Sequence, residues 1–144
     1  MTTIFVRSSL IAATCAAAAI LVTPAMAAIV NLKAELKASS EVPPTDSKGA
    51  GSLTATFDTT SKQLTWKGKV SGLTGTATAA HFHAGEVGKN GAVVVPINGA
   101  DKGTFEGSAT LTDAQAADLM GGKWYVNVHT AANKAGEIRG QVTK

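Results

Sequence analysis

The chain has 144 residues, which is the size of a single domain, and its formal net charge is +3. Its lysines and arginines form no basic run, so the sequence lacks the usual signature of a nucleic-acid-binding protein. One cysteine, Cys15, excludes an intramolecular disulfide.

The first 27 residues have the three-part layout of a secretory signal peptide. Arg7 supplies a positive charge, residues 10–22 are apolar, and Ala25-Met26-Ala27 fits a small-residue cleavage site. The apolar run is shorter than the roughly 20 residues that a membrane span needs. We therefore expect cleavage after Ala27 and a secreted or periplasmic mature chain, residues 28–144, with no membrane span.

Cys15 offers an alternative reading as a lipid-attachment site. Thr14 precedes it, whereas bacterial lipidation signals usually have a small residue such as Gly or Ala there, so cleavage after Ala27 is favoured. That cleavage removes Cys15 and Arg7, which leaves no thiol and 12 basic residues against 10 acidic ones. The mature domain is then almost neutral and depends on its apolar core alone.

Apolar and polar residues alternate with a period of two along much of the mature chain, the pattern of half-buried strands. Residues 92–97 are uniformly apolar, so they are expected either to be buried on both faces or, because of Pro96, to lie at a sheet edge. The predicted strands are residues 30–37, 52–58, 63–70, 79–84, 92–97, 105–111, 124–130 and 137–142.

The period changes after the sixth predicted strand. Thr112 and Gln115 have the spacing of a capping box, and Gly121 and Gly122 supply a stop. A two-turn helix is expected between them, with an apolar stripe of Ala116, Leu119 and Met120. Eight strands and one short helix predict an all-β antiparallel sandwich.

The three histidines of the chain all fall on strand faces opposite the apolar ones. His81 and His83 are two residues apart, so their side chains point the same way, and His129 alternates with Val126 and Val128. Other polar groups share these faces. If the strands are neighbours, one patch is expected that contains His81, His83, Tyr125, Asn127, His129, Glu137, Arg139 and Gln141.

Neutral imidazole is a good ligand for zinc and copper, so His81, His83 and His129 are a candidate metal site. The alternative is that the histidines hydrogen-bond to carboxylates, for which Glu86 and Glu137 are candidates. Glu137 and Arg139 are themselves expected to form a surface ion pair, with recognition of a polar or anionic partner as the alternative.

Several spaced motifs resemble the chordin (CHRD) domain family, from about residue 36 to residue 142. The motifs are Glu41-Val42-Pro43-Pro44, residues 80–85 (AHFHAG), 90–94 (NGAVV), 124–130 (WYVNVHT) and 136–141 (GEIRGQ). The family usually has Asn-Pro before the last motif, where this chain has Asn133-Lys134-Ala135. The resemblance implies an immunoglobulin-like β-sandwich in an exported protein and leaves the biochemical role open.

The His-x-His motif on a strand also resembles copper-zinc superoxide dismutase, which is a β-sandwich with four histidines at copper. Three histidines cannot reproduce that site, although a reduced copper-only site remains open. Three hypotheses follow: an exported module that binds a metal ion or an extracytoplasmic protein, a copper-dependent redox enzyme guided by Arg139, or a structural envelope or matrix domain.

Overall fold

The computed structural model describes residues 28–144. The predicted signal peptide, residues 1–27, lies outside the described residues, so its cleavage stays a prediction. Two short 3₁₀ helices, Ala38–Ser40 and Ala100–Lys102, lie between strands. The main elements are β1 (Ile29–Lys37), β2 (Ala50–Asp58), β3 (Gln63–Ser71), β4 (Ala77–Ala84), β5 (Val93–Ile97), β6 (Thr104–Thr110), α1 (Asp113–Met120), β7 (Trp124–Thr130) and β8 (Ile138–Gln141).

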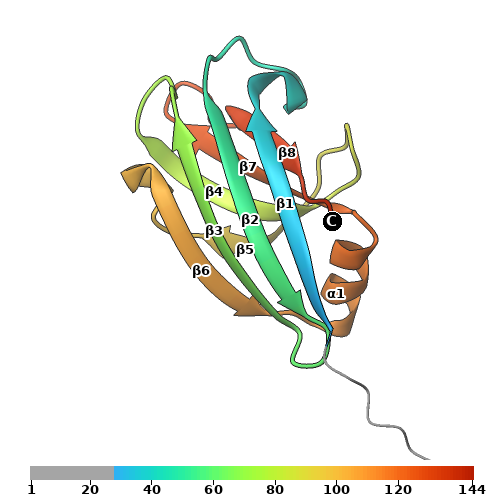
Figure 1. Ribbon diagram of the computed structural model, residues 1–144. Coiled ribbons are helices and arrows are strands. Elements are labelled where there is room, and N and C mark those ends of the chain that lie inside the picture. The colour runs from blue at the N-terminus through green and yellow to red at the C-terminus, as the bar shows by residue number, and fades with distance from the viewer. Residues whose placement is uncertain (1–27) are drawn as a thin grey trace, which may run out of the picture.

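All eight strands belong to one antiparallel sheet in the order β5-β4-β7-β8-β1-β2-β3-β6. The sheet bends so that β1, β2, β3 and β6 form one layer and β4, β5, β7 and β8 form the other (Figure 1). The predicted all-β fold with one short helix is confirmed. The two layers are continuous rather than separate sheets, because β1 pairs with β2 on one side and β8 on the other.

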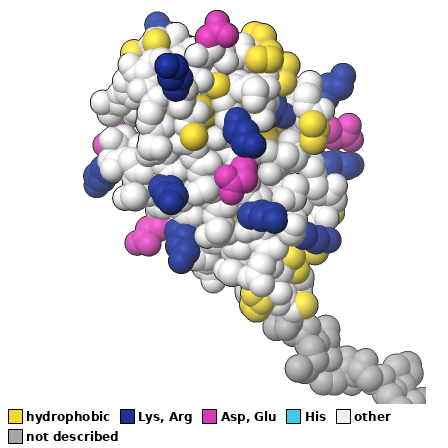
Figure 2. Space-filling model, turned by 45° about the horizontal axis from the view of Figure 1, so that its top comes forward, with side chains coloured by type: hydrophobic (Ala, Val, Ile, Leu, Met, Phe, Trp, Pro, Cys, Tyr) yellow, Lys and Arg dark blue, Asp and Glu magenta, His cyan; other side chains and the backbone are white. Residues whose placement is uncertain are grey.

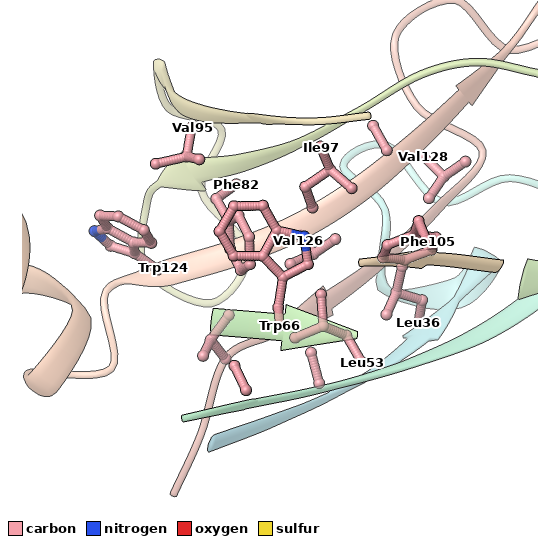
Figure 3. Close-up of a cluster of buried hydrophobic side chains, with 14 of the residues drawn as sticks. Leu36, Leu53, Trp66, Phe82, Val95, Ile97, Phe105, Trp124, Val126 and Val128 are labelled. Carbon is pink, nitrogen blue, oxygen red and sulfur yellow. The ribbon is translucent and has the colours of Figure 1, made fainter. Parts of the chain in front are cut away.

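The core lies between the two layers and is built by the alternating inward residues of each strand. Trp66 from β3 meets Phe82 from β4 edge-on, with ring centroids 5.1 Å apart, and Trp124 packs beside Phe82 (Figure 3). Burial of each large apolar side chain stabilises the fold by about 1.5–3 kcal/mol. This core holds the layers together without any disulfide.

Of the two positions expected for residues 92–97, the structure shows the one at the sheet edge. β5 lies at the end of the sheet and pairs only with β4. Val93 is 51% exposed and Pro96 is exposed, so burial on both faces was wrong for this strand. Pro96 fits here because an edge strand has a side on which no ladder hydrogen bond is required.

The predicted capping box of α1 is confirmed. The Thr112 hydroxyl accepts a hydrogen bond from the Gln115 backbone N–H, and the Gln115 side chain accepts one from the Thr112 N–H. Leu119 is buried, whereas Ala116 and Met120 are half-buried against the core. Within residues 28–144, no helix combines the length and the apolar character that a membrane crossing requires.

The junction between β8 and β1 closes the sheet over a short stretch. Lys37 pairs with Arg139, and Lys33 pairs with Thr143 just beyond β8. Gly140 lies in this junction, where an added Cβ would collide with the backbone carbonyl of Glu35. Only a residue without a side chain lets the two strands approach so closely.

We therefore expect Gly140→Ala to lower the free energy of unfolding by about 1–3 kcal/mol, because the backbone of β1 cannot move aside as a flexible side chain can. The measurement is urea denaturation. Gly75→Ala is the matched control, because a Cβ at Gly75 meets no atom within 4 Å. Equal stability of the two variants would contradict the tight junction.

Candidate functional site

Strands β4 and β7 bring the three histidines together on the outer side of the sheet. The two strands are antiparallel neighbours, with Ala79 opposite His129 and His81 opposite Asn127. The Nδ1 atom of His81 lies 3.2 Å from the Nε2 atom of His129. One nitrogen from each of His81, His83 and His129 lies within 4.8 Å of the others. Three imidazoles from two strands therefore converge on one point.

Backbone carbonyls fix the orientation of two of these rings. The Nδ1–H of His83 donates to the Gly91 carbonyl at 2.9 Å, and the Nδ1–H of His129 donates to the Lys134 carbonyl at 2.9 Å. A carbonyl only accepts, so in each neutral ring the lone pair is on Nε2. The carboxylate partners expected for the histidines, Glu86 and Glu137, are replaced by these carbonyls.

The surroundings favour the neutral form of His81 and His83. Burial lowers the pKa of His81, and the neighbouring His129 and His83 lower it further. Burial also lowers the pKa of His83, although its hydrogen bond to Gly91 acts in the opposite direction. Neutral imidazole has the free lone pair that a metal ion requires.

His83 is the first of three stacked side chains. The rings of His83 and Tyr125 are nearly parallel, 7° apart, with centroids separated by 4.8 Å. On the stack, the Arg139 guanidinium carbon lies 3.4 Å from the centroid of the Tyr125 ring. Arginine over an aromatic face is a favourable cation–π arrangement, and it is stronger where water is excluded. Tyr125 and Arg139 are each 2% exposed, so this part of the predicted patch is buried.

Arg139 also anchors the loop that follows β4. Its guanidinium donates to the carbonyls of Glu86 and Lys89, at 3.1 and 2.7 Å, and to the Asn90 side chain at 3.1 Å. Gly91, the next residue of this loop, provides the carbonyl that orients His83. Arg139 thus acts as a positioning residue for the cluster.

Glu41 is a member of the site that the sequence analysis did not single out. Glu41 is 5% exposed. Its Oε1 atom and the Asn127 amide nitrogen lie so close to Gly136 that a Cβ atom added at Gly136 would collide with both. Burial raises the pKa of Glu41. The hydrogen bond from the Val42 backbone N–H and the charge of Arg139 partly offset this effect. The Glu-Val-Pro-Pro motif at residues 41–44 marked this position, but alternation did not indicate that the carboxyl turns inward.

Two buried oxygens beside the histidines have no hydrogen-bond partner among the described residues. These are Glu41 Oε1 and Asn127 Oδ1. The buried Nε2 nitrogen of His83 also has no hydrogen-bond partner there. An unsatisfied buried polar atom costs about 1–3 kcal/mol. A bound group that reached these atoms would remove this cost.

Glu137 and Arg139 do not form the expected surface ion pair. Both are buried, and they belong to different networks. Alternation indicated correctly that they leave the core face, but not that loops cover that face. Gln141, also part of the predicted patch, instead donates to the carbonyls of Gly85 and Gly122, and so ties β8 to two loops.

Hydroxyl groups surround the carboxylate of Glu137, which is 0% exposed. It accepts hydrogen bonds from the side chains of Ser47, Thr74 and Thr130 at 2.5–2.7 Å, and from the Thr74 backbone N–H at 2.7 Å. Burial alone opposes its ionisation, but these hydrogen bonds prevail and lower its pKa from 4.5 to about 2. The carboxylate therefore links its own loop, the loops of Ser47 and Thr74, and β7.

The motifs on this polar face agree with a family-level comparison. A family model described as the CHRD domain matches residues 32–142. The chain belongs to this family. The match covers nearly all of the described residues, including the three histidines, Glu41, Glu137 and Arg139, and it confirms the resemblance seen in the sequence. Comparisons with curated proteins and with solved structures give no match.

The low pKa of Glu137 predicts a loss of stability in acid. Its folded pKa lies below its ordinary value, so ionised Glu137 stabilises the CHRD domain above about pH 4.5, and this contribution disappears as the pH falls toward 2. Glu137→Gln should lower the free energy of unfolding at pH 7 by about 2–3 kcal/mol, because an amide cannot accept all these hydrogen bonds.

The measurement is denaturant unfolding at intervals from pH 7 to pH 2. The difference between the natural protein and Glu137→Gln should shrink over the acid range. Glu106→Gln, which alters an exposed carboxylate, is the control and should leave the neutral-pH stability unchanged. A pH-independent difference would show that the charge of Glu137 is not what stabilises the fold.

Proposed function

We propose that this CHRD domain is an exported binding module that holds one copper or zinc ion through His81, His83 and His129. The observation that carries the proposal is the convergence of three imidazole nitrogens within 4.8 Å, two of them on rings whose other nitrogen is fixed by a backbone carbonyl. Such second hydrogen bonds are the usual support of metal-binding histidines. The signal-like sequence of residues 1–27 supports export.

Hydrogen bonding alone accounts for only part of this arrangement. The Nδ1–H of His81 can donate to Nε2 of His129, since the other nitrogen of His129 donates to Lys134. That bond leaves the Nε2 lone pair of His83 buried and without a partner among the described residues. A metal ion would use the lone pairs of all three rings.

The distances suit a small metal ion. Nitrogen ligands lie about 2.0–2.1 Å from zinc, so two of them at a tetrahedral angle are about 3.3 Å apart. The separation of His81 Nδ1 and His129 Nε2 is 3.2 Å. All three ligand atoms lie within 4.8 Å of one another, so modest side-chain movement completes a three-nitrogen site. Imidazole ligands suit both copper and zinc, and Cu(II) is expected to bind more tightly.

The test is calorimetric titration of the purified protein with Cu(II) and Zn(II). We expect one equivalent of Cu(II) to bind with a dissociation constant below about 1 μM, and Zn(II) to bind more weakly. The double variant His81→Ala/His83→Ala should lose at least about 100-fold in affinity, because it removes two of three ligands. Electron paramagnetic resonance of bound Cu(II) should show coupling to nitrogen.

Lys134→Ala is the matched control. It changes a side chain in the loop after β7, next to His129, but retains the backbone carbonyl that orients His129. Its affinity should equal that of the natural protein. Near-ultraviolet circular dichroism checks that each variant is folded before titration. Absence of binding, or equal binding by the double variant, would overturn the metal proposal and favour a structural or protein-binding domain.

A further inference from the structure

The outer face of the β1-β2-β3-β6 layer differs from the histidine face, because no loop covers it. Outward residues of the four strands align in rows: Lys33, Thr54, Lys67 and Glu106 form one, and Asn31, Thr56, Thr65 and Ser108 form the next. All eight are exposed. Figure 2 shows cationic side chains spread over a mostly uncharged surface on this side, with no histidine in view.

Two shallow hollows adjoin on this face. One, of about 800 Å³, is lined by both rows, and the other, of about 740 Å³, continues from Thr54, Lys67 and Glu106 toward Lys69 and Lys102. Together they form a long open groove. Strands are about 4.8 Å apart, so Lys33 and Lys67 stand about 10 Å apart across it, a spacing suited to an extended ligand rather than a compact one.

The charge along the groove is one-sided. Five lysines line it, against one acidic side chain, Glu106; they are Lys33, Lys67, Lys69, Lys102 and Lys144. The ion pairs within residues 28–144 are Lys62–Asp113 and Lys123–Asp118, so none of the five groove lysines forms a salt bridge. The domain is nearly neutral overall, yet it concentrates positive charge in this groove, where the charge forms no salt bridge within the described residues. Such a field attracts a polyanion.

We propose that this groove binds an acidic polysaccharide, one that carries carboxylate or sulfate groups along its chain. The lysines would pair with the anionic groups as mobile point charges. The hydroxyls of Thr54, Thr56, Thr65 and Ser108 both donate and accept hydrogen bonds, which matches the hydroxyls of sugars.

Two other classes of polyanion fit less well. The large exposed apolar residues of the described chain are Ile29, Val87 and Val93, and none lines the groove. A single-stranded nucleic acid would lack the aromatic platform on which its bases stack. A lipid surface would lack the apolar anchor that interfacial proteins insert.

The test measures binding of the purified protein to polygalacturonate at low salt, with uncharged dextran as the neutral comparison and chelator present to remove metal. Binding to polygalacturonate should weaken as salt is added, because screening shortens the range of the lysine charges. Lys67→Gln/Lys69→Gln should weaken it at least tenfold. Lys89→Gln/Lys134→Gln removes the same charge from exposed positions outside the groove and should change it less than twofold.

Equal losses in the two double variants would overturn the proposal, because they would show that only net charge matters. Absence of binding to polygalacturonate, or equal binding to dextran, would also overturn it, as would tighter binding to vesicles rich in phosphatidylglycerol. His81→Ala/His83→Ala should bind polygalacturonate as the natural protein does, so this result is independent of the metal proposal. Thermal unfolding confirms that each variant is folded.

Discussion

The register of β7 is the constraint on which both the core and the candidate site depend. β7 pairs with β4 on one side and, over Tyr125 to Val128, with β8 on the other, so it lies in the interior of the sheet. Trp124, Val126 and Val128 then face the core, while Tyr125 and His129 face outward. A slip of one residue would exchange the two sets. The apolar residues that stabilise the core therefore also fix where the histidines stand.

The outer face of the layer that contains β4, β7 and β8 carries two buried charges, Arg139 and Glu137, and each has different hydrogen-bond partners. Arg139 is met by two carbonyls, an amide and an aromatic ring, whereas Glu137 is met by hydroxyls and a backbone N–H. Neither takes part in a salt bridge among the described residues, although the charge of Arg139 also acts on the buried Glu41. In return, each charge holds loops in place, and one of those loops orients His83.

The sequence was sufficient to predict what depends on local pattern. Period-two alternation gave the strands and the shared face of His81, His83 and His129, and the Thr112–Gln115 spacing gave the start of α1. Alternation states on which side of a sheet a residue lies, but not what covers that side. It therefore placed Glu137 and Arg139 at the surface, and it did not reveal Glu41, whose carboxyl enters the site from a loop.

Strand order was also beyond the sequence, because pairing between distant segments depends on how the two layers close. The continuity of the sheet through β8 and β1 rests on a short pairing, and Gly140 permits it by lacking a side chain. Repeated residue spacing cannot reveal such an approach of two backbones. The strand pattern and the family resemblance both predicted the fold class, but the contacts of individual residues came only from the structure.

The two outer faces of the sheet illustrate two ways of presenting polar groups. On one, loops partly cover the residues, burial lowers the pKa of His81 and His83, and one nitrogen from each histidine lies within 4.8 Å of the others. On the other, no loop intervenes, and lysines and hydroxyls are exposed along an open groove. Burial favours a specific ligand at fixed geometry, whereas exposure favours a repetitive ligand held by many weak contacts. Because the core separates the faces, occupation of one need not disturb the other.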